Sequence, residues 1–238
     1  GAQTQRSIEN FKIGPIGSIP KEIVYAYAIV KMSAAVSNNE LKILDSNKKS
    51  LIVKVCKEIL EGKHDSQFPL VIWQTGSGTQ TNMNINEVIS NRAHEIHGGK
   101  LDDDIKIIHP NDDVNKSQSS NDTFPTSMSI ACYKIIKEKT LPALKDLKNT
   151  IEKKSSIYKE VIKIGRTHLM DATPISLGQE FSAFGAQIEN GIKSLENSLK
   201  RLLEVPIGGT AVGTGLNTPK NYDKIMCKNI SKFIGIEF

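Results

Sequence analysis

The sequence has few aromatic residues, few cysteines and no long apolar run. Its three cysteines, Cys56, Cys132 and Cys227, lie far apart and form no Cys-x-x-Cys pair. This spacing argues against both a disulfide framework and a zinc site. No apolar run is long enough to cross a membrane and no secretory signal is recognisable. We therefore expect no membrane association and a cytoplasmic location, with the mitochondrial matrix as the alternative.

Positive charge is in excess but is not gathered in one place. The net charge is +5 at pH 7, and the lysines are dispersed along the chain. A nucleic-acid-binding surface usually appears as a basic cluster with interleaved aromatic residues, and the sequence has none. We therefore expect no nucleic-acid partner. The charge is better interpreted as steering of small anions toward the protein.

Apolar residues recur every three or four positions over most of the chain, which predicts a mainly helical protein. Helices are expected over about 21–36, 46–61, 122–139, 141–158 and 219–234, and another is expected to end at Gly98-Gly99. The most regular pattern covers 177–205 and forms the seam of a bundle helix through Leu177, Phe181, Phe184, Ile188, Ile192, Leu195, Leu199 and Leu202. Residues 1–20 are predicted to be irregular, and 68–73 to be extended and buried. The expected fold class is all-α.

Three polar stretches, 74–82, 109–125 and 165–174, interrupt the apolar patterns. They are rich in hydroxyl and amide groups and contain few strong acids, which suits holding a carboxylate and moving a proton on a small anion. In the first stretch, Gly76-Ser-Gly-Thr79 matches neither the dinucleotide fingerprint nor the P-loop, so nucleotide binding is only weakly supported. Its backbone N–H groups and hydroxyls can still lie against an anion at a helix start. The alternative is a glycine turn with a capping hydroxyl.

In the second stretch, Asn121 or Asp122 is predicted to cap the helix that follows. The capped end would bring free backbone N–H groups and the positive end of the helix dipole close to Ser119 and Ser120. Such an arrangement suits a small anion. The alternative is a solvated, well-capped loop without a ligand.

The histidines separate into one informative position and one misleading motif. His168 lies in the third polar stretch and can exchange protons near neutral pH, and Asp171 three residues on could fix its tautomer. The alternative is a hydrogen-bonded structural histidine. His94 and His97 lack the i, i+4 spacing of a zincin motif, and no third ligand is apparent. We interpret them as a solvent-facing pair near a helix end.

Taken together, the polar stretches resemble the fumarase/aspartase superfamily. The segments that carry the resemblance span the chain and are specific as a set: 1–7, 75–80, 82–84, 86–87, 109–122, 165–174 and 208–217. Within the superfamily they resemble most closely the class II fumarate hydratase family, whose forms are Gly-Ser-Gly-Thr at 76–79, His-Pro-Asn-Asp at 109–112 and Arg-Thr-His at 166–168. Aspartases usually have Gln in place of His168 and Asn in place of His109.

The resemblance implies reversible hydration of fumarate to (S)-malate by anti addition of water through a carbanion-like intermediate, without metal or other cofactor. His168 would donate or accept the proton, working through a bound water. By the same resemblance, the substrate carboxylates would be held by Ser77, Gly78, Thr79, Ser119, Ser120, Asn121 and Thr167. A second dicarboxylate site outside the active site would comprise Lys106, His109, Pro110, Asn111 and Asp112.

Two departures from the family pattern qualify these implications. The family more often has Arg at the position of Lys106, and a lysine ammonium does not form the bidentate contact that a guanidinium forms. The family also has a mobile loop, Gly-Ser-Ser-x-Met-Pro-x-Lys-x-Asn-Pro, which supplies the serine base, and it occurs nowhere in these 238 residues. We interpret the sequence as an N-terminal portion of a longer enzyme, and we expect the portion alone to be inactive.

The family further implies a homotetramer whose active sites are shared between subunits. It divides this chain into a mainly helical N-terminal domain, 1–116, and the first long helices of a central helical bundle, 117–238. Two other functions stay open. One is a different lyase of the superfamily, either an aspartate ammonia-lyase or an argininosuccinate-type enzyme. The other is an all-α module that binds a dicarboxylate without chemistry.

Overall fold

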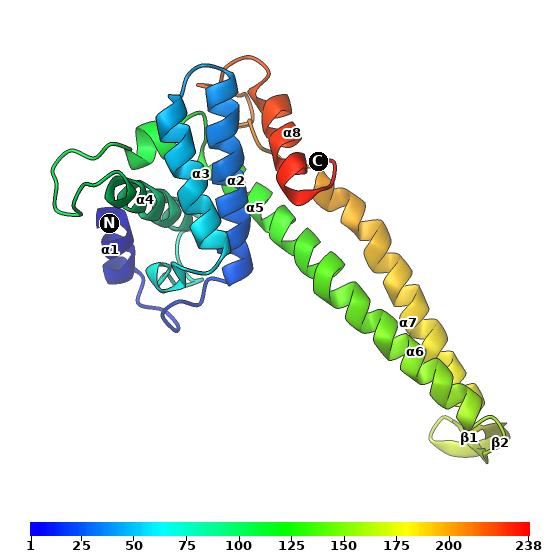
Figure 1. Ribbon diagram of the computed structural model, residues 1–238. Coiled ribbons are helices and arrows are strands. Elements are labelled where there is room, and N and C mark those ends of the chain that lie inside the picture. Colours follow the sequence, from blue (N-terminus) through cyan, green and yellow to red (C-terminus); the bar gives the residue numbers. More distant parts are fainter. The chain divides into compact units, whose positions relative to one another are not determined.

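The computed structural model describes residues 1–238, which divide into two compact units (Figure 1). The first unit comprises 1–131 and 203–238, and the second comprises 132–202. The elements of the first unit are α1 (Ala2–Asn10), α2 (Lys21–Glu40), α3 (Ser46–Leu60), η1 (Asp65–Gln67), α4 (Thr79–Ile96), η2 (Pro110–Val114), most of α5 (Ser120–Ile135) and α8 (Tyr222–Ile234).

Helix α2 lies between two hydrophobic clusters and is buried on both sides, because small and apolar residues occur all round it. On one side, Tyr27, Ala28 and Met32 pack with residues of α3 and α4. On the other side, α2 packs against Ile130 of α5 and Met226 of α8. Figure 1 shows α2 between α3 and α8 in this unit. The burial of α2 on both sides makes it the centre of the first unit.

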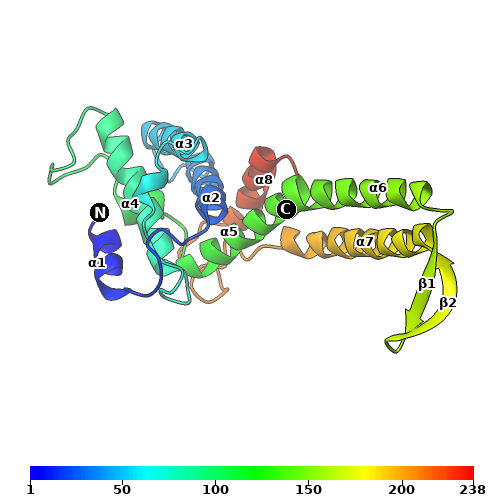
Figure 2. The same cartoon turned by 90° about the horizontal axis from the view of Figure 1, so that it is seen from below.

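The second unit is a pair of long antiparallel helices with a short hairpin between them (Figure 2). It includes η3 (Ile136–Thr140), α6 (Leu141–Ile157), β1 (Ile162–Thr167), β2 (Met170–Ser176) and α7 (Leu177–Leu199), which continues into η4 (Lys200–Leu203). The two strands pair antiparallel. A capping box starts α7, because the Ser176 hydroxyl accepts the Gln179 N–H and the Gln179 side chain accepts the Ser176 N–H.

The mainly helical fold class is confirmed, as are the helices expected over 21–36, 46–61, 141–158 and 219–234, with small shifts at their ends. The helix expected over 122–139 begins two residues earlier and gives way to η3 at Ile136. The helix expected over 177–205 ends at Leu199. The expected domain boundary at 116/117 concerns a longer family member and stays a prediction.

The small hairpin over 162–176 is compatible with the mainly helical class, although the sequence did not indicate it. Two expectations are wrong. Residues 1–20 contain a helix, α1, whose first turn is held by the Glu87 carboxylate through the N–H groups of Gln3 and Thr4. In 68–73 the burial stops halfway, because Ile72 and Trp73 are exposed while the preceding apolar residues are buried.

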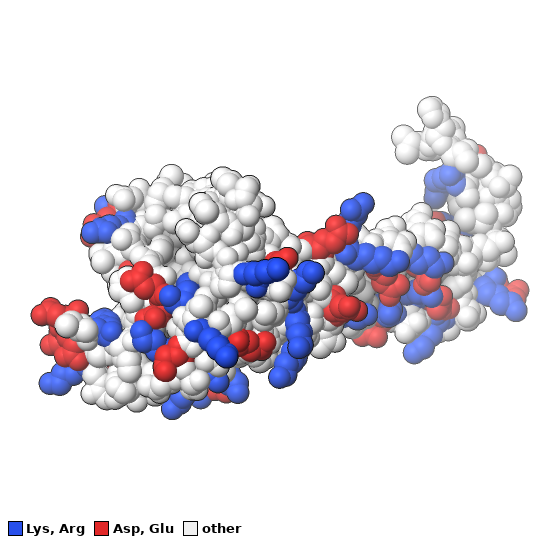
Figure 3. Space-filling model, turned by 90° about the horizontal axis from the view of Figure 1, so that it is seen from above, with Lys and Arg blue, Asp and Glu red and all other residues white.

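Charged side chains are mixed over the surface. Figure 3 shows Lys and Arg distributed among Asp and Glu on the face in view, with no single continuous basic area. On the helix pair, Lys148 of α6 pairs with Glu189 of α7 at 2.6 Å, and Lys145 of α6 pairs with Glu196 of α7 at 3.5 Å. None of the helices combines the length and the apolar composition that crossing a bilayer requires.

Candidate functional site

Hydroxyl groups from the first two polar stretches meet in the first unit. The Ser77 and Thr79 hydroxyls lie 2.9 Å apart, and the Thr79 hydroxyl lies 2.9 Å from that of Ser120. Thr79 is the first residue of α4 and Ser120 is the first residue of α5. The starts of two helices therefore converge on one group of hydroxyls, which we call the hydroxyl cluster. Each start carries a partial positive charge from its unpaired N–H groups.

Gly78 allows this convergence. It precedes α4 with a left-handed φ of 68°, a conformation that favours glycine. A Cβ at Gly78 would lie 2.2 Å from the ring of Phe124, which belongs to α5. The backbone at the start of α4 thus packs directly on an aromatic side chain of α5. This contact sets the spacing of the two helix starts.

The predicted caps of α5 are wrong by two or three residues. The Ser119 hydroxyl accepts the N–H of Asn121 at 3.2 Å, so Ser119 is the residue that caps the helix. The Asp122 carboxylate reaches back and accepts the N–H of Ser119 at 3.0 Å. Asn121 and Asp122 lie inside the first turn because the helix begins at Ser120. The side chain of Asn121 is therefore free of the capping role.

Asn121 and Asp122 instead connect α5 to the glycine-rich segment 208–217. Asn121 Nδ2 donates to the carbonyl of Ala211 at 2.8 Å. The second oxygen of Asp122 accepts the N–H groups of Gly208 at 3.1 Å and Thr210 at 2.9 Å. Burial raises the pKa of the Asp122 carboxyl, and these N–H bonds only partly offset it. The sequence did not indicate this anchoring role.

The residue chemistry of the hydroxyl cluster suits an anionic oxygen group. It offers hydroxyl donors and the starts of two helices. At α4 the N-cap residue, Gly78, has no side chain, and the Gln74 side chain accepts the N–H of Thr81 at 3.1 Å. The nearest acid on α5, Asp122, turns its carboxylate away to the glycine-rich segment and is only 1% exposed. The cluster itself contains no carboxylate that would repel an anion.

Thr167 and His168 belong to the second unit, at the tip of the hairpin. Thr167 pairs with Met170, which leaves His168 and Leu169 as a two-residue turn. Both turn residues have positive φ, 50° and 63°, as a type I′ turn requires and as non-glycine residues rarely adopt. His168 is exposed, and Leu169 is 97% exposed. The hairpin thus holds His168 outward in a strained turn.

The suggested pairing of Asp171 with His168 is not formed. Asp171 lies opposite Arg166 in the hairpin, and its carboxylate is 3.1 Å from the Arg166 Nε. Both side chains of this pair are mostly exposed. The tautomer of His168 is therefore not set by Asp171 in this structure.

The residues expected to form a second dicarboxylate site lie in and just before η2. His109 precedes η2, its Nδ1 accepts the N–H of Asp112 at 3.1 Å, and the Asp112 carboxylate lies 3.0 Å from the same nitrogen. Both side chains are mostly exposed, and Asn111 is exposed between them. Lys106 donates to Asn91 of α4. The turn thus presents His109, Pro110, Asn111 and Asp112 together, with Lys106 directed to α4.

Asp113 holds the same turn from its buried side. Its carboxylate accepts the N–H of His109 at 2.9 Å and pairs with Lys48 of α3 at 2.8 Å. Asp113 is buried, so this pair is shielded from solvent more than the pairs on the helix surfaces are. The position of His109 is therefore fixed by α3.

His94 is not solvent-facing, which corrects the interpretation of the His94–His97 motif. His94 is only 6% exposed, its Nδ1 accepts the N–H of Ile107 at 3.3 Å, and its Nε2 lies 2.8 Å from the Asp103 carboxylate. It is a structural histidine that ties the 100–108 connector to α4. No group of three or more His, Cys, Asp or Glu side chains is arranged to hold a metal ion.

Sequence reasoning missed Lys31. This lysine of α2 is fully buried, and its Nζ donates to the amide oxygens of Asn82, Asn115 and Gln118. Burial lowers the pKa of Lys31 to about 7. In the sequence it is one polar residue in an apolar helix pattern, which is the usual appearance of a surface position.

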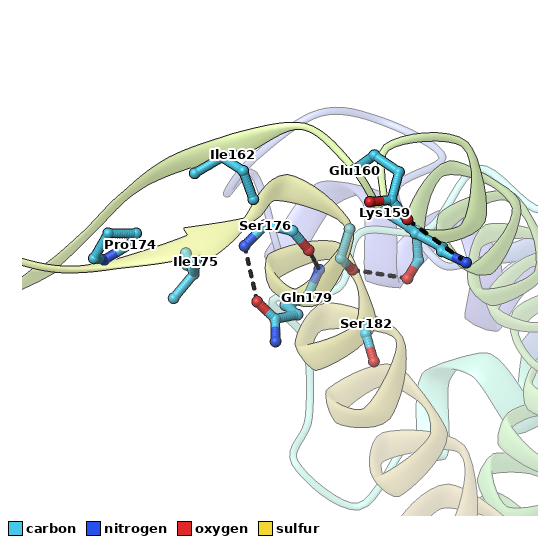
Figure 4. Close-up of a pocket in the computed structure, with 10 residues that line it drawn as sticks. Lys159, Glu160, Ile162, Pro174, Ile175, Ser176, Gln179 and Ser182 are labelled. Carbon is cyan, nitrogen blue, oxygen red and sulfur yellow. Dashed lines mark hydrogen bonds and ion pairs between the residues drawn. The ribbon is translucent and has the colours of Figure 1, made fainter.

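A pocket of about 520 Å³ lies in the second unit, where the hairpin joins α6 and α7 (Figure 4). Ile162, Pro174 and Ile175 of the hairpin, Lys159 and Glu160 beyond α6, and Gln179 of α7 line it. The Ser176–Gln179 capping box lies at its base (Figure 4). None of the predicted site residues lines this pocket.

Comparison with known proteins gives one consistent result. A lyase family model matches residues 1–237. The chain is 59% identical over 237 residues to a fumarate hydratase class II of Pasteurella multocida and 53% identical over 238 residues to one of Helicobacter pylori; in both cases the match covers 100% of this chain and 51% of the relative. The chain spans about half the length of the curated relatives it matches.

Two solved structures are similar over the same extent. A class II fumarase from Schistosoma mansoni has a TM-score of 0.94 and 44% sequence identity, covering 99% of this chain and 49% of that one. A fumarate lyase:delta crystallin from Brucella melitensis, solved bound to cobalt, has a TM-score of 0.95 and 41% identity, covering 100% of this chain and 52% of that one.

Proposed function

Because the chain belongs to the lyase family whose model matches residues 1–237, we propose that it is the N-terminal portion of a class II fumarate hydratase. Such an enzyme interconverts fumarate and (S)-malate by adding or removing water. The observation that carries the proposal is the hydroxyl cluster, in which Ser77, Thr79 and Ser120 join the starts of α4 and α5. The identities of 53–59% to relatives named fumarate hydratase class II support it.

The hydroxyl cluster would hold one carboxylate of the substrate. Hydroxyls donate hydrogen bonds to carboxylate oxygens, and two helix starts stabilise the charge. Asn121 fits the same role because its Nδ2 carries two hydrogens. One of them donates to the Ala211 carbonyl, which orients the amide and leaves the second hydrogen for a ligand. Ser119 and Gly78 complete the proposed substrate-binding set in the first unit. Thr167, in the second unit, is assigned to the set by the family resemblance alone.

His168 would transfer the proton that turns the leaving hydroxyl into water. In the malate-to-fumarate direction, a base removes the proton from the carbon next to the hydroxyl-bearing one, leaving a carbanion-like intermediate. Its electron pair forms the C=C bond as the C–O bond breaks, and the departing oxygen takes a proton to become water. The imidazole of His168 is suited to supply that proton, directly or through a water. The base itself is expected on the family's serine loop, which these 238 residues do not contain.

Further parts of the proposal rest on the family resemblance. The protein would be a homotetramer with shared active sites, located in the cytoplasm, and it would need no metal or other cofactor. Lys106 and the 109–112 turn would form a second dicarboxylate site on the surface. The 238-residue portion alone would bind a dicarboxylate without turning it over, because the serine loop is missing.

The test is a direct comparison of two substrates in the full-length protein that contains this sequence. We expect ready hydration of fumarate and aspartate deamination at background level, since the histidine forms of the motifs at 109 and 168 are those of the hydratases. Comparable turnover of aspartate would leave only the superfamily assignment standing. Binding of a dicarboxylate with neither activity would favour the alternative of a binding module.

A further inference from the structure

Lys31 is buried in the first unit with three hydrogen-bond acceptors around its amine. Its Nζ lies 2.7 Å from Asn82 Oδ1, 2.9 Å from Asn115 Oδ1 and 3.0 Å from Gln118 Oε1, and its side chain has no exposed surface. All three acceptors are uncharged amide oxygens. Burying a lysine without an adjacent carboxylate partner costs folding free energy, which points to a role for Lys31 other than stability.

The number of acceptors matches the charged form of the amine. An ammonium group has three N–H donors, and each of them has one amide oxygen here. A neutral amine has only two donors and presents a lone pair, so one of the three oxygens would lose its partner and face that lone pair. The network is complete only when Lys31 is protonated.

The network leads directly to the hydroxyl cluster. Asn82 Nδ2 donates to Asn115 Oδ1 at 3.1 Å, and Asn115 Nδ2 donates to the Gln118 carbonyl at 3.2 Å. Gln118 is followed in the chain by Ser119, which caps α5, and by Ser120, which belongs to the cluster. Lys31 therefore ties the middle of α2 and the first half of α4 to the segment that places Ser119 and Ser120.

We propose that Lys31 is a positioning residue whose ammonium group holds the 115–118 segment and thereby sets the hydroxyl cluster for binding a dicarboxylate. The proposal rests on the function proposed above. Lys31 does not touch the ligand: it acts through Asn115 and Gln118. Its effect is expected mainly on substrate binding, because the cluster holds a carboxylate and the proton transfer belongs to His168.

A positioning role for an ammonium group predicts a dependence on pH. Besides the amides, Asp122 of α5 and the Cys56 thiol of α3 influence Lys31, and the Tyr27 ring of α2 lies 5.8 Å from its Nζ. Burial is the largest influence and lowers the pKa of Lys31 to about 7, while Asp122 opposes it. Dicarboxylate affinity should therefore weaken as pH rises through about 7.

The experiment uses the full-length protein, with fumarate as substrate and succinate as an unreactive dicarboxylate probe. Lys31→Met keeps a straight apolar side chain and removes the donors. We expect it to raise KM for fumarate and Kd for succinate roughly 10- to 100-fold, to lower kcat much less, and to abolish the weakening of binding with rising pH. Lys21→Met is the control, because Lys21 lies on the same helix and is 67% exposed. The control should match the parent protein in KM and in pH profile.

A second variant keeps the test decisive if Lys31→Met does not fold. Asn115→Asp places a carboxylate next to the Lys31 amine and gives up a single donor bond, to Gln118. A neighbouring negative charge favours the ammonium form, so the pH at which succinate binding weakens should move up by about one unit or more.

The outcomes separate the two proposals. An active parent protein whose Lys31→Met variant keeps the parent KM and pH profile overturns the role of Lys31 and leaves the hydratase function intact. An unmoved pH profile in Asn115→Asp does the same. A parent protein that neither hydrates fumarate nor binds succinate overturns both.

Discussion

The carboxylate of Asp122 accepts the backbone N–H of Gly208 at 3.1 Å, across 86 residues of sequence. The same oxygen accepts the N–H of Thr210, and the other oxygen accepts that of Ser119. One buried side chain in the first turn of α5 therefore holds both the cap of its own helix and the start of the glycine-rich segment. Asp122 therefore links segment 208–217 to the segment that carries Ser119 and Ser120 of the hydroxyl cluster.

Replacing Asp122 by Asn should loosen the glycine-rich segment. An amide has one acceptor oxygen where the carboxylate has two, so either Ser119 or the Gly208 and Thr210 pair loses its partner. We expect faster hydrogen exchange at the affected amides, because their free energy of local opening should fall by about 1–3 kcal/mol. Asp102→Asn, at an exposed position, is the control and should leave exchange at 208–210 unchanged.

Comparing Asp122→Asn with the parent protein also tests the direction in which the pKa of Asp122 is shifted. Burial raises the pKa of Asp122 in the folded state above its usual value of 3.8. The folded protein therefore holds this proton more tightly than the unfolded chain does. The stability contribution is full below about pH 3.8 and is lost as pH rises through the raised pKa. Relative to Asp122→Asn, the parent protein should lose unfolding free energy as pH rises through that window. An opposite slope would mean that the N–H bonds outweigh burial.

Gly78 should tolerate no side chain. Gly78→Ala forces an L-residue into φ of 68° and drives its Cβ into the Phe124 ring. We expect a loss of at least about 2 kcal/mol of unfolding free energy and a higher KM for fumarate, since the starts of α4 and α5 must separate. The matched control is Gly76→Ala, because a Cβ at Gly76 meets no atom within 4 Å. Denaturant unfolding of the two variants, followed with the same probe, should give a clearly lower unfolding free energy for Gly78→Ala than for Gly76→Ala.

The two histidines of the polar stretches should differ in kinetic effect. In the full-length protein, His168→Asn is expected to lower kcat by about 10²–10⁴-fold, the usual contribution of a positioned acid or base. His109→Asn should lower kcat far less, because His109 is placed in the η2 turn and is assigned to the second site. Steady-state kinetics on both variants measures this. Equal losses, or a larger loss for His109→Asn, would reverse the assignment.

The parts of the fold that the sequence predicted are those that depend on local pattern. Apolar spacing located α2, α3 and α8, because each buries a stripe or a whole surface, and it located α6, whose face toward α7 is half-buried. Helix α1 was not predicted, because its first turn is held by Glu87, a residue far along the chain. The hairpin was missed because its turn is His168-Leu169, without the glycine or asparagine that usually marks a type I′ turn.

The candidate site likewise has parts that the sequence indicated and parts that depend on contacts between distant segments. The resemblance brought forward Ser77, Thr79 and Ser120, and the structure places their hydroxyls in contact. The supports of these residues depend on contacts between segments far apart in sequence, such as Gly78 against Phe124 and Asp122 against Gly208. No local pattern encodes such contacts. Lys31 is the extreme case, because a buried lysine and a surface lysine look alike in one sequence.

Close packing of α6 and α7 should depend on Gly178 and not on Gly191, although both belong to α7. A Cβ at Gly178 would lie 2.5 Å from the Ser155 carbonyl oxygen and 2.6 Å from the Lys159 Cα, and neither backbone atom can turn aside. The Ser155 hydroxyl also donates to the Gly178 carbonyl at 2.7 Å, so separating the helices breaks this bond. Gly178→Ala should therefore cost about 2–3 kcal/mol locally.

Gly191→Ala should have the opposite sign. Gly191 is exposed and a Cβ there meets nothing within 4 Å, so the substitution removes only the flexibility of glycine and strengthens the helix by up to about 1 kcal/mol. Hydrogen exchange of the α7 amides in the full-length protein measures both effects. We expect exchange roughly 30- to 100-fold faster in Gly178→Ala, since each 1.4 kcal/mol is tenfold, and equal or slower exchange in Gly191→Ala. The close contact at Gly178 is expected to hold the start of α7 against α6, and with it the hairpin that carries His168. Equal exchange in the two variants would show that this contact does not have that role.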